Sequence, residues 1–260
     1  MRKSTDMPGQ TVPVRYSRQA LFEGIGASGQ ARIMDSRAAL IGCGGLGSVL
    51  AETLVRAGIG FMRIVDPDTV EASNLQRQTL FDTLDAGKNV FKAEAAGQKL
   101  MKINPGTAVE AVVGDFLDSI DEVIEGCNVI LDGTDNYRTR YALNRAAVMR
   151  GIPWVFGAVA GSIGMSAAVI PGKTPCLHCL LGPEPDATDM PDSSIAGIIG
   201  PAVQMTASIQ ATETLRLICC SPAEIPCRMI HLDVWEHKYR VVDTAQSRDP
   251  DCVVCGGLTR

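Results

Sequence analysis

Four cysteines in two C-x-x-C pairs form the clearest metal-binding pattern in the sequence. Cys176 and Cys179 flank Leu-His, and Cys252 and Cys255 flank Val-Val. Four thiolates at this local spacing favour a tetrahedral zinc site, and with no open coordination position the metal would be structural. The alternatives are a redox-active dithiol and cysteines that only fill the core, and His178 could replace one thiolate.

A glycine-rich turn is the second pattern, and it indicates a bound nucleotide. Gly42, Gly44, Gly45 and Gly47 follow an apolar run and open a helical one. Glycines permit a tight turn and let backbone N–H groups approach a phosphate, while a helix N-terminus favours negative charge. Asp66 follows at the end of the next apolar run, where a carboxylate can bind ribose hydroxyls. The turn alone does not decide between a dinucleotide, ATP and no ligand.

The polar segment that begins at Asp66 and ends at residue 78 adds candidates for phosphate binding. Asp68, Asn74 and Arg77 lie in it. Asn74 and Arg77 are one helical turn apart and would point the same way. An arginine there can bind a phosphate through two nitrogens, which suits an enzyme that breaks a triphosphate better than one that transfers a hydride. The alternative for Arg77 is a solvated surface position.

Two other segments place polar residues after predicted strands or at the start of a helix. Asp135 and Asn136 directly follow a strand, and a carboxylate beside phosphates commonly holds Mg²⁺. Either residue could instead cap the next helix. Lys92 begins a helix after a loop that contains Lys88. A lone lysine in such a place is usually a surface residue.

Alternating apolar strands and helices must bring these residues together. We expect strands at 37–41, 61–65, 108–113, 128–131 and 153–156, and helices at 19–35, 48–56, 92–103, 119–125 and 137–150. This alternation predicts an α/β fold with a Rossmann-like, mostly parallel sheet and helices on both faces. A hairpin at 158–171, a helix at 202–218 and strands at 229–234 and 239–244 would form an antiparallel C-terminal extension, stapled by the Cys₄ zinc site. Residues 184–192 are expected to form an exposed loop.

Composition narrows the class of protein. The chain has 260 residues, 46% of them hydrophobic, and a net charge of −5. Without a basic stripe, the acidic balance argues against a nucleic-acid partner. The uncharged stretches 154–172 and 193–212 contain Gly, Ser, Thr or Pro, which favours buried elements over membrane spans. Nine cysteines and no secretory signal predict a reducing, cytoplasmic location.

In this order, the motifs resemble the MoeB/ThiF/HesA family, bacterial relatives of the ubiquitin-activating enzymes. The resemblance runs from Arg15 to Gly257 and rests on these segments: Gly42–Gly47, Asp66, Ser73–Arg77, Lys92, Thr134–Asn136 and the two cysteine pairs. It implies an adenylyltransferase that uses ATP to adenylate the C-terminal carboxylate of a ubiquitin-like sulfur-carrier protein ending in Gly-Gly, with release of pyrophosphate. A sulfur donor would then convert the adenylate to a thiocarboxylate, in the biosynthesis of molybdopterin, thiamin or another metabolite.

The resemblance also implies a role for each site residue. Gly45 and its neighbours would line the ATP site, and Asp66 and Asp68 would belong to it, with Asp66 on the ribose. Phosphates would contact Asn74, Arg77 and Lys92, and Asp135, followed by Asn136, would hold Mg²⁺. The family works as a homodimer, and Arg18 would reach into the partner's ATP site. The catalytic set is therefore Arg77, Lys92, Asp135 and Arg18.

One adenylation domain is expected over residues 1–260. It would comprise an N-terminal arm with helices (1–35), a nucleotide-binding half (36–156) and a zinc-stapled carrier-binding half (157–260). The chain departs from the family in two places. The segment from Gly87 to Lys92 is longer than the family's compact Gly-x-Pro-Lys, so Lys88 competes with Lys92, which is the better match because Ala-Glu-Ala-Ala follows it. No cysteine lies between Leu180 and Ile218, where several members carry one for a thioester link.

Two other functions fit part of the pattern. An NAD(P)-dependent oxidoreductase would need only the glycine turn and Asp66. A zinc-stapled scaffold could bind a carrier protein without activating it. Neither alternative explains the phosphate-binding candidates and the cysteine pairs together.

Overall fold

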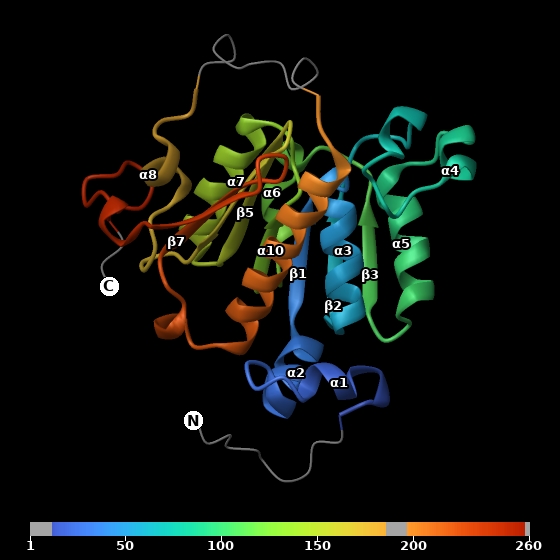
Figure 1. Cartoon of the computed structure of the whole chain (residues 1–260), viewed down its shortest axis with the longest axis horizontal. Helices are drawn as coiled ribbons and strands as arrows, with labels where there is room; N and C mark the ends of the chain where they lie inside the picture. The colour runs from blue at the N-terminus through green and yellow to red at the C-terminus, as the bar shows by residue number, and fades with distance from the viewer. Residues whose placement is uncertain (1–11, 186–196, 258–260) are drawn as a thin grey trace.

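The apolar runs form strands of a single sheet in the computed structural model, which describes residues 12–185 and 197–257 (Figure 1). The sheet has eight strands in the order β3-β2-β1-β4-β5-β6-β7-β8. Their bounds are β1 (Arg37–Ile41), β2 (Phe61–Val65), β3 (Ala108–Val112), β4 (Val129–Asp132), β5 (Trp154–Ala160), β6 (Ile163–Val169), β7 (Arg228–Asp233) and β8 (Lys238–Asp243). The first five in chain order pair in parallel and the last three pair antiparallel. The predicted fold class is therefore confirmed.

Helices cover both faces of the parallel part. Figure 1 shows α3, α5 and α10 side by side on one face, whereas α6 and α7 lie on the other. The helix bounds are α1 (Ser17–Ala20), α2 (Gly26–Asp35), α3 (Gly45–Ala57), α4 (Thr83–Gly87), α5 (Lys92–Ile103), α6 (Ile120–Ile124), α7 (Tyr137–Arg150), α8 (Leu177–Leu181) and α10 (Gly200–Cys219).

The central strand β1 shows why the sheet needs both helical layers. Leu40 packs in the core cluster that contains Leu50 of α3, whereas its neighbour Ile41 packs in the cluster that contains Leu143 of α7. Successive side chains of a strand point to opposite faces, so a strand buried on both sides reads as an unbroken apolar run. The run from residue 37 to 41 therefore predicted β1 at its observed bounds.

Most expected elements are present, and the differences have local causes. The bounds of α5 and α7 match the prediction. The helix expected at 19–35 is instead broken between α1 and α2, and Gly26, the first residue of α2, has a φ of +63°. A left-handed residue cannot continue a right-handed helix. The hairpin begins earlier than expected because all of β5 pairs with β6. Most of the expected loop at 184–192 lies outside the described residues.

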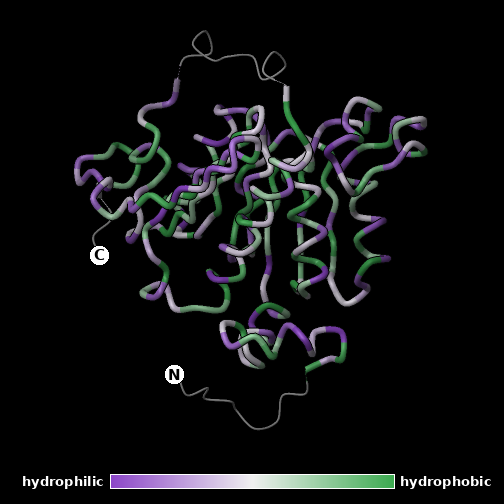
Figure 2. Tube along the Cα trace, viewed as in Figure 1, coloured by the Kyte–Doolittle hydropathy of each residue, from purple (hydrophilic) through white to green (hydrophobic). Residues whose placement is uncertain are grey.

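Among the described residues, no helix is both long enough and apolar enough to cross a bilayer. The longest, α10, has 20 residues and overlaps the uncharged stretch at 193–212. Figure 2 shows hydrophilic and hydrophobic residues mixed along it. Val203 and Ala207 on its inner side are fully buried in the sheet's core cluster, so this segment is a core helix, as predicted.

Candidate nucleotide site and cysteine cluster

The glycine turn joins β1 to α3 at the topological switch point of the sheet, where the strand order reverses its direction. From β1 the order runs to β2 and β3 on one side and to β4 and β5 on the other. In parallel α/β sheets, ligands bind in the crevice that opens at the carboxyl ends of the strands at such a point. The loop after β4 lies against the turn, because Gly133 contacts the backbone of Gly42 and Gly47. The crevice is therefore formed by two loops that are far apart in sequence.

Two of the predicted glycines serve this contact between loops. A Cβ atom on Gly47 would lie 2.0 Å from the Gly42 carbonyl oxygen, and one on Gly133 would lie 2.3 Å from the same oxygen. Gly42 itself has a φ of +84°, in the left-handed region that favours glycine. Gly42 and Gly47 thus let two backbones approach, and the close packing with Gly133 could not be read from the motif.

Gly47→Ala should therefore destabilise the protein by about 3 kcal/mol, because the added methyl group would overlap the Gly42 carbonyl of the backbone. Gly87→Ala is the matched control. Its added Cβ would meet nothing within 4 Å, so its stability should stay within about 1 kcal/mol of the wild type. Urea unfolding of both variants measures the difference. Equal stabilities would show that the turn packs in another way.

Gly44 and Gly45 form the start of α3. Gly44 is the N-cap, and its position has no side-chain cap hydrogen bond. The first N–H groups of a helix lack partners within the helix and attract anions. Arg77 and Gln78 flank this start, since the Arg77 Cγ lies 3.7 Å from an ideal Cβ on Gly45 and the Gln78 Nε2 lies 3.7 Å from one on Gly44. The structure therefore brings the predicted arginine to the predicted turn.

The Asp66 carboxylate links the glycine turn to the polar segment after β2 through hydrogen bonds. Its Oδ2 accepts a hydrogen bond from the Cys43 N–H at 2.6 Å, and its Oδ1 accepts one from the Asp68 N–H at 2.9 Å. The residue is buried, and burial raises the pKa of its carboxyl, while the N–H of Cys43 and the charge of Lys92 oppose that rise. Each carboxylate oxygen has a second lone pair, which leaves room for a hydroxyl ligand.

Lys92 lies beside this carboxylate and forms an ion pair with Asp68. The Lys92 Nζ is 2.7 Å from the Asp68 Oδ2, and the Lys92 side chain is only 8% exposed. The competing Lys88 is exposed at the C-cap of α4. The structure thus gathers Asp66, Asp68 and Lys92 and leaves Lys88 outside the group.

Asn74 and Arg77 lie on one backbone turn, in which the Arg77 N–H donates to the Asn74 carbonyl at 3.1 Å. Asn74 ends a short 3₁₀ helix (Ala72–Asn74), is buried, and forms a capping box with Glu71. Arg77 is half-buried, and its Nη1 donates to the Ser73 carbonyl at 3.1 Å. The two residues are therefore one turn apart, although the segment from residue 72 to 78 is a short 3₁₀ helix followed by turns and is not a regular α-helix.

Asp135 and Asn136 are both exposed in the loop after β4. The Asn136 side chain accepts a hydrogen bond from the Thr139 N–H at 2.9 Å and caps α7. The capping alternative therefore holds for Asn136. Asp135 lies two residues beyond Gly133, which touches the glycine turn, so it belongs to the loop that meets the turn.

The sequence did not single out a buried ion pair below this loop. The Asp132 Oδ2 and the Arg140 Nε are 3.1 Å apart, and both side chains are almost fully buried. The only signal in the sequence was an aspartate at the end of an apolar strand with an arginine on the following helix. That signal is common, and only the tertiary structure shows that the two side chains meet.

Arg18 lies far from the glycine turn of its own chain. It is exposed on α1, which Figure 1 places at the end of the sheet opposite the turn. The neighbouring Tyr16 ring lies within 2.6 Å of an ideal Cβ on Gly58, the C-cap of α3. Because α3 has 13 residues and a helix rises about 1.5 Å per residue, the two ends are about 20 Å apart. Arg18 is therefore not part of this chain's own crevice.

The four predicted cysteines come together although 76 residues separate each contacting pair across the two motifs. The sulfur atoms of Cys176 and Cys252 are 3.7 Å apart, and those of Cys179 and Cys255 are 3.6 Å apart. All four lie within 4.8 Å of one another. Zinc–sulfur bonds of about 2.3 Å in a regular tetrahedron place sulfurs about 3.8 Å apart. The cluster could therefore hold a metal ion, and His178 is not needed.

Burial raises the pKa of the Cys176 thiol, and it raises that of Cys179 to about 11. A bound cation would favour the thiolates instead. The other cysteines do not join the cluster. We expected them to be buried apolar residues, which holds for Cys43, Cys127 and Cys219, whereas Cys220 and Cys227 are half-buried.

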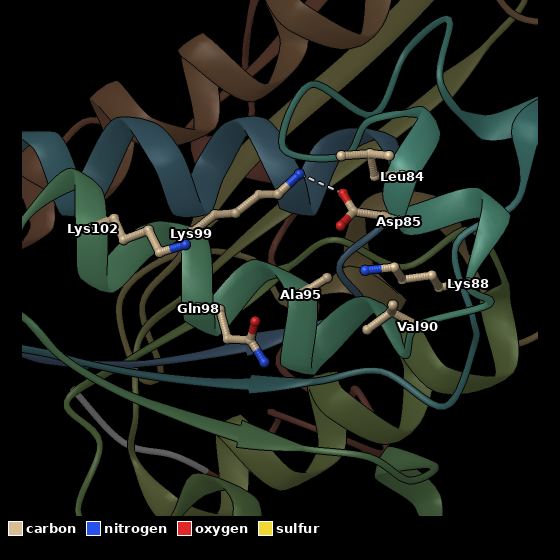
Figure 3. Close-up of a pocket in the computed structure, with 8 residues that line it drawn as sticks. All are labelled: Leu84, Asp85, Lys88, Val90, Ala95, Gln98, Lys99 and Lys102. Carbon is tan, nitrogen blue, oxygen red and sulfur yellow. Dashed lines mark hydrogen bonds and ion pairs between the residues drawn. The ribbon is translucent and has the colours of Figure 1, made fainter.

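A separate pocket of about 190 Å³ lies between α4 and α5 (Figure 3). Lys88 lines it, and the Lys99 ammonium there pairs with Asp85. The pocket is lined by Leu84, Asp85, Lys88, Val90, Ala95, Gln98, Lys99 and Lys102. Since the glycine turn contributes nothing to its lining, it is distinct from the crevice.

Known proteins resemble this chain over nearly its whole length. The chain is 44% identical to the sulfur carrier protein ThiS adenylyltransferase of Bacillus subtilis over 93% of this chain and 71% of that protein. It is 34% identical to the sulfur carrier protein adenylyltransferase of Thermus thermophilus, over 93% of this chain and 90% of that protein. The SAMP-activating enzyme E1 of Haloferax volcanii is 35% identical, over 93% and 88%.

Solved structures share the fold. The crystal structure of E. coli MccB with ATP aligns with a TM-score of 0.78 at 24% identity, over 95% of this chain and 75% of that chain. The family model described as "ThiF family" matches residues 16–254. This match and the named relatives confirm the resemblance seen in the motifs, and they leave no support for an oxidoreductase. The chain belongs to the ThiF family.

Proposed function

We propose that the chain is an adenylyltransferase that uses ATP to adenylate the C-terminal carboxylate of a ubiquitin-like sulfur-carrier protein. The observation that carries this proposal is the convergence of Arg77, Lys92 and the Asp135 loop on the glycine turn, in a chain that belongs to the ThiF family. The Bacillus subtilis relative, which is named for this activity, is 44% identical. Pyrophosphate would be the second product.

The chemistry suits the residues in the crevice. A C-terminal carboxylate is already ionised at pH 7, so its attack on the α-phosphorus of ATP needs no general base. The reaction instead needs positioning and neutralisation of the charge on the phosphoryl oxygens. The N-terminus of α3, Arg77 and Lys92 would bind the phosphates, and Asp66 would accept hydrogen bonds from the ribose. The burial of Lys92 beside Asp66 and Asp68 supports it over Lys88 as the phosphate lysine.

Two metal ions belong to this proposal. Asp135 would hold Mg²⁺, which would neutralise phosphate charge when bound. Its exposure, in the loop that meets the glycine turn, is compatible with that role. The cysteine cluster would hold a structural zinc, because its sulfur–sulfur distances of 3.6 and 3.7 Å across the two motifs match the separation of about 3.8 Å in a tetrahedral Zn–S₄ site.

The active form would be a homodimer in which Arg18 completes the partner's site. Support for this arrangement comes from the position of Arg18, which lies at the opposite end of α3 from its own glycine turn. An arginine at that place can approach a glycine turn only in a second copy. Because a two-fold interface repeats each contact, the dimer would have two equivalent sites.

Mixing two inactive variants tests the dimer. Arg18→Ala and Arg77→Ala should each be inactive alone. In a mixed dimer, the subunit with Arg18→Ala keeps its own Arg77 and receives an intact Arg18 from its partner. Random mixing at equal concentrations should then restore about a quarter of wild-type activity. No recovery after unfolding and refolding of the mixture would place Arg18 in its own chain's site, and wild-type activity of Arg18→Ala alone would place it outside both sites.

The partners would be a carrier protein ending in Gly-Gly and a sulfur donor, in a pathway to thiamin, molybdopterin or a related product. We place the enzyme in the cytoplasm, where ATP and reduced thiols are both available. We treat residues 1–260 as one adenylation domain, because the sheet continues from the nucleotide half into the cysteine-rich half through the pairing of β5 with β6.

ATP–pyrophosphate exchange measures the proposed step directly. Labelled pyrophosphate should enter ATP only when the enzyme, Mg²⁺ and a carrier ending in Gly-Gly are all present. Carriers of the thiamin and molybdopterin types should be compared, each with a control that lacks the last glycine. A scaffold without catalytic activity would bind a carrier and give no exchange with any of them, which would refute the proposal.

A further inference from the structure

The loop that carries Asp135 rests on a charged pair inside the protein. Asp132, the last residue of β4, is 0% exposed, and Arg140, one helical turn into α7, is 4% exposed. The Arg140 Nε lies 3.1 Å from the Asp132 Oδ2. Removing two charges from water is unfavourable, and apolar residues of similar volume often stabilise a fold equally well. The position of the pair therefore needs a reason other than stability.

Thr134, the residue before Asp135, forms hydrogen bonds with this pair through its N–H, its hydroxyl and its carbonyl. The Asp132 Oδ1 accepts hydrogen bonds from the Thr134 N–H at 3.0 Å and from its hydroxyl at 2.7 Å. The Arg140 Nη2 donates to the Thr134 carbonyl at 2.5 Å. Asp132 as the acceptor and Arg140 as the donor together determine the direction of the backbone that leads into Asp135.

The same pair anchors the loop to the other half of the molecule. Arg140 donates to the Gly157 carbonyl of β5 at 3.0 Å, and the Gly157 N–H lies 3.3 Å from the Asp132 Oδ2. The Gln210 side chain of α10 donates to the Asp132 carbonyl at 2.8 Å. An added Cβ on Gly157 would lie 2.2 Å from the Gln210 side chain, so the network is closely packed.

We propose that Asp132 and Arg140 are positioning residues. They hold the Thr134–Asp135 backbone so that, before the nucleotide binds, the Asp135 carboxylate already points to the place that the phosphates and Mg²⁺ will occupy. This inference rests on the role proposed above for Asp135. Groups that orient a metal ligand typically change metal affinity by about 10- to 100-fold when they are removed. The pair should therefore affect binding of ATP with Mg²⁺ more than binding of ATP alone.

Arg140→Lys tests this effect, with Arg63→Lys as the matched control. Arg63 also pairs with a carboxylate, that of Glu110 at 3.0 Å, and donates to carbonyls of a neighbouring segment, but it lies near α6. Calorimetric titration with ATP should be done with Mg²⁺ and with EDTA. We expect Arg140→Lys to raise the Kd with Mg²⁺ about tenfold or more and to change the Kd in EDTA less than about twofold. Arg63→Lys should change neither value.

A second pair of variants covers the case in which Arg140→Lys does not fold. Thr134→Val removes the hydroxyl that binds Asp132 at almost constant shape, and Thr134→Ser restores it. The valine variant should raise the Kd with Mg²⁺ about threefold or more, and the serine variant should recover it. Equal changes with Mg²⁺ and with EDTA, or no change in a folded variant, would overturn the positioning role. If wild-type binding of ATP does not depend on Mg²⁺, the assignment of Asp135 itself fails and the inference with it.

Discussion

Arg77→Ala should lower ATP–pyrophosphate exchange by about 10²–10³-fold, because a fixed cation beside developing phosphoryl charge is typically worth that much. The Arg77 side chain is half-buried against the start of α3, and its guanidinium donates a hydrogen bond to the Ser73 carbonyl. It makes no contact that the fold visibly needs among the described residues. The loss should therefore appear in the rate and not in the unfolding curve.

Arg56→Ala is the control for removing an arginine from this region. Arg56 lies on α3 as well, at the end away from the turn, and pairs with Glu52 on the surface. The exchange rate of the Arg56→Ala enzyme should equal that of the wild type. Arg77→Lys should retain part of the activity, since a lysine keeps the charge but loses the planar pair of donors. An Arg77→Ala enzyme with wild-type exchange would remove Arg77 from the catalytic set.

Cys176→Ser should remove the metal and destabilise the C-terminal half. The Cys176 sulfur contacts those of both Cys179 and Cys252, so its loss breaks the link between two distant segments. Structural zinc contributes about 10–16 kcal/mol of apparent binding free energy in small domains. Even a third of that would lower the melting temperature by about 10 °C or more in a chain of this size. Elemental analysis should find about one zinc per wild-type chain and less than about 0.2 in the variant.

Cys220→Ser provides the matched comparison. Cys220 is half-buried at the C-cap of α10 and lies outside the cluster. Its variant should keep the zinc and melt within about 2 °C of the wild type. If Cys176→Ser retains full metal content, the cluster is not the binding site. If the wild type contains no metal and forms a disulfide on mild oxidation that a thiol reductant reverses, the redox alternative is correct.

The sequence predicted the elements whose pattern is local. The apolar run of β1 and the helical period of α5 predicted the bounds of these elements, because a strand or helix buried by a regular sheet shows that burial in its residues. The cysteine pairs were equally clear, since structural zinc sites are typically built from cysteines and histidines at short spacing. The family resemblance rested on several such local motifs in one order.

Other features depended on contacts between distant segments. Gly133 had no motif of its own, and its role appears only where the loop after β4 meets the glycine turn. Likewise, the choice of Lys92 over Lys88 for the crevice depends on the ion pair with Asp68 across the two segments. The capping box between Asn74 and Glu71 was also not visible in the sequence.

The chain's residue types and spacing determined by themselves that it has a nucleotide turn, a four-cysteine cluster and a mostly parallel sheet. Only the tertiary structure decided which side chains share the crevice and that Asp132 and Arg140 bind the backbone of the loop that carries Asp135. The physical reason is the range of the interactions. Periodic burial and metal-ligand spacing are short-range constraints along the chain, whereas ion pairs and backbone contacts between loops arise only when the sheet brings its strand ends together.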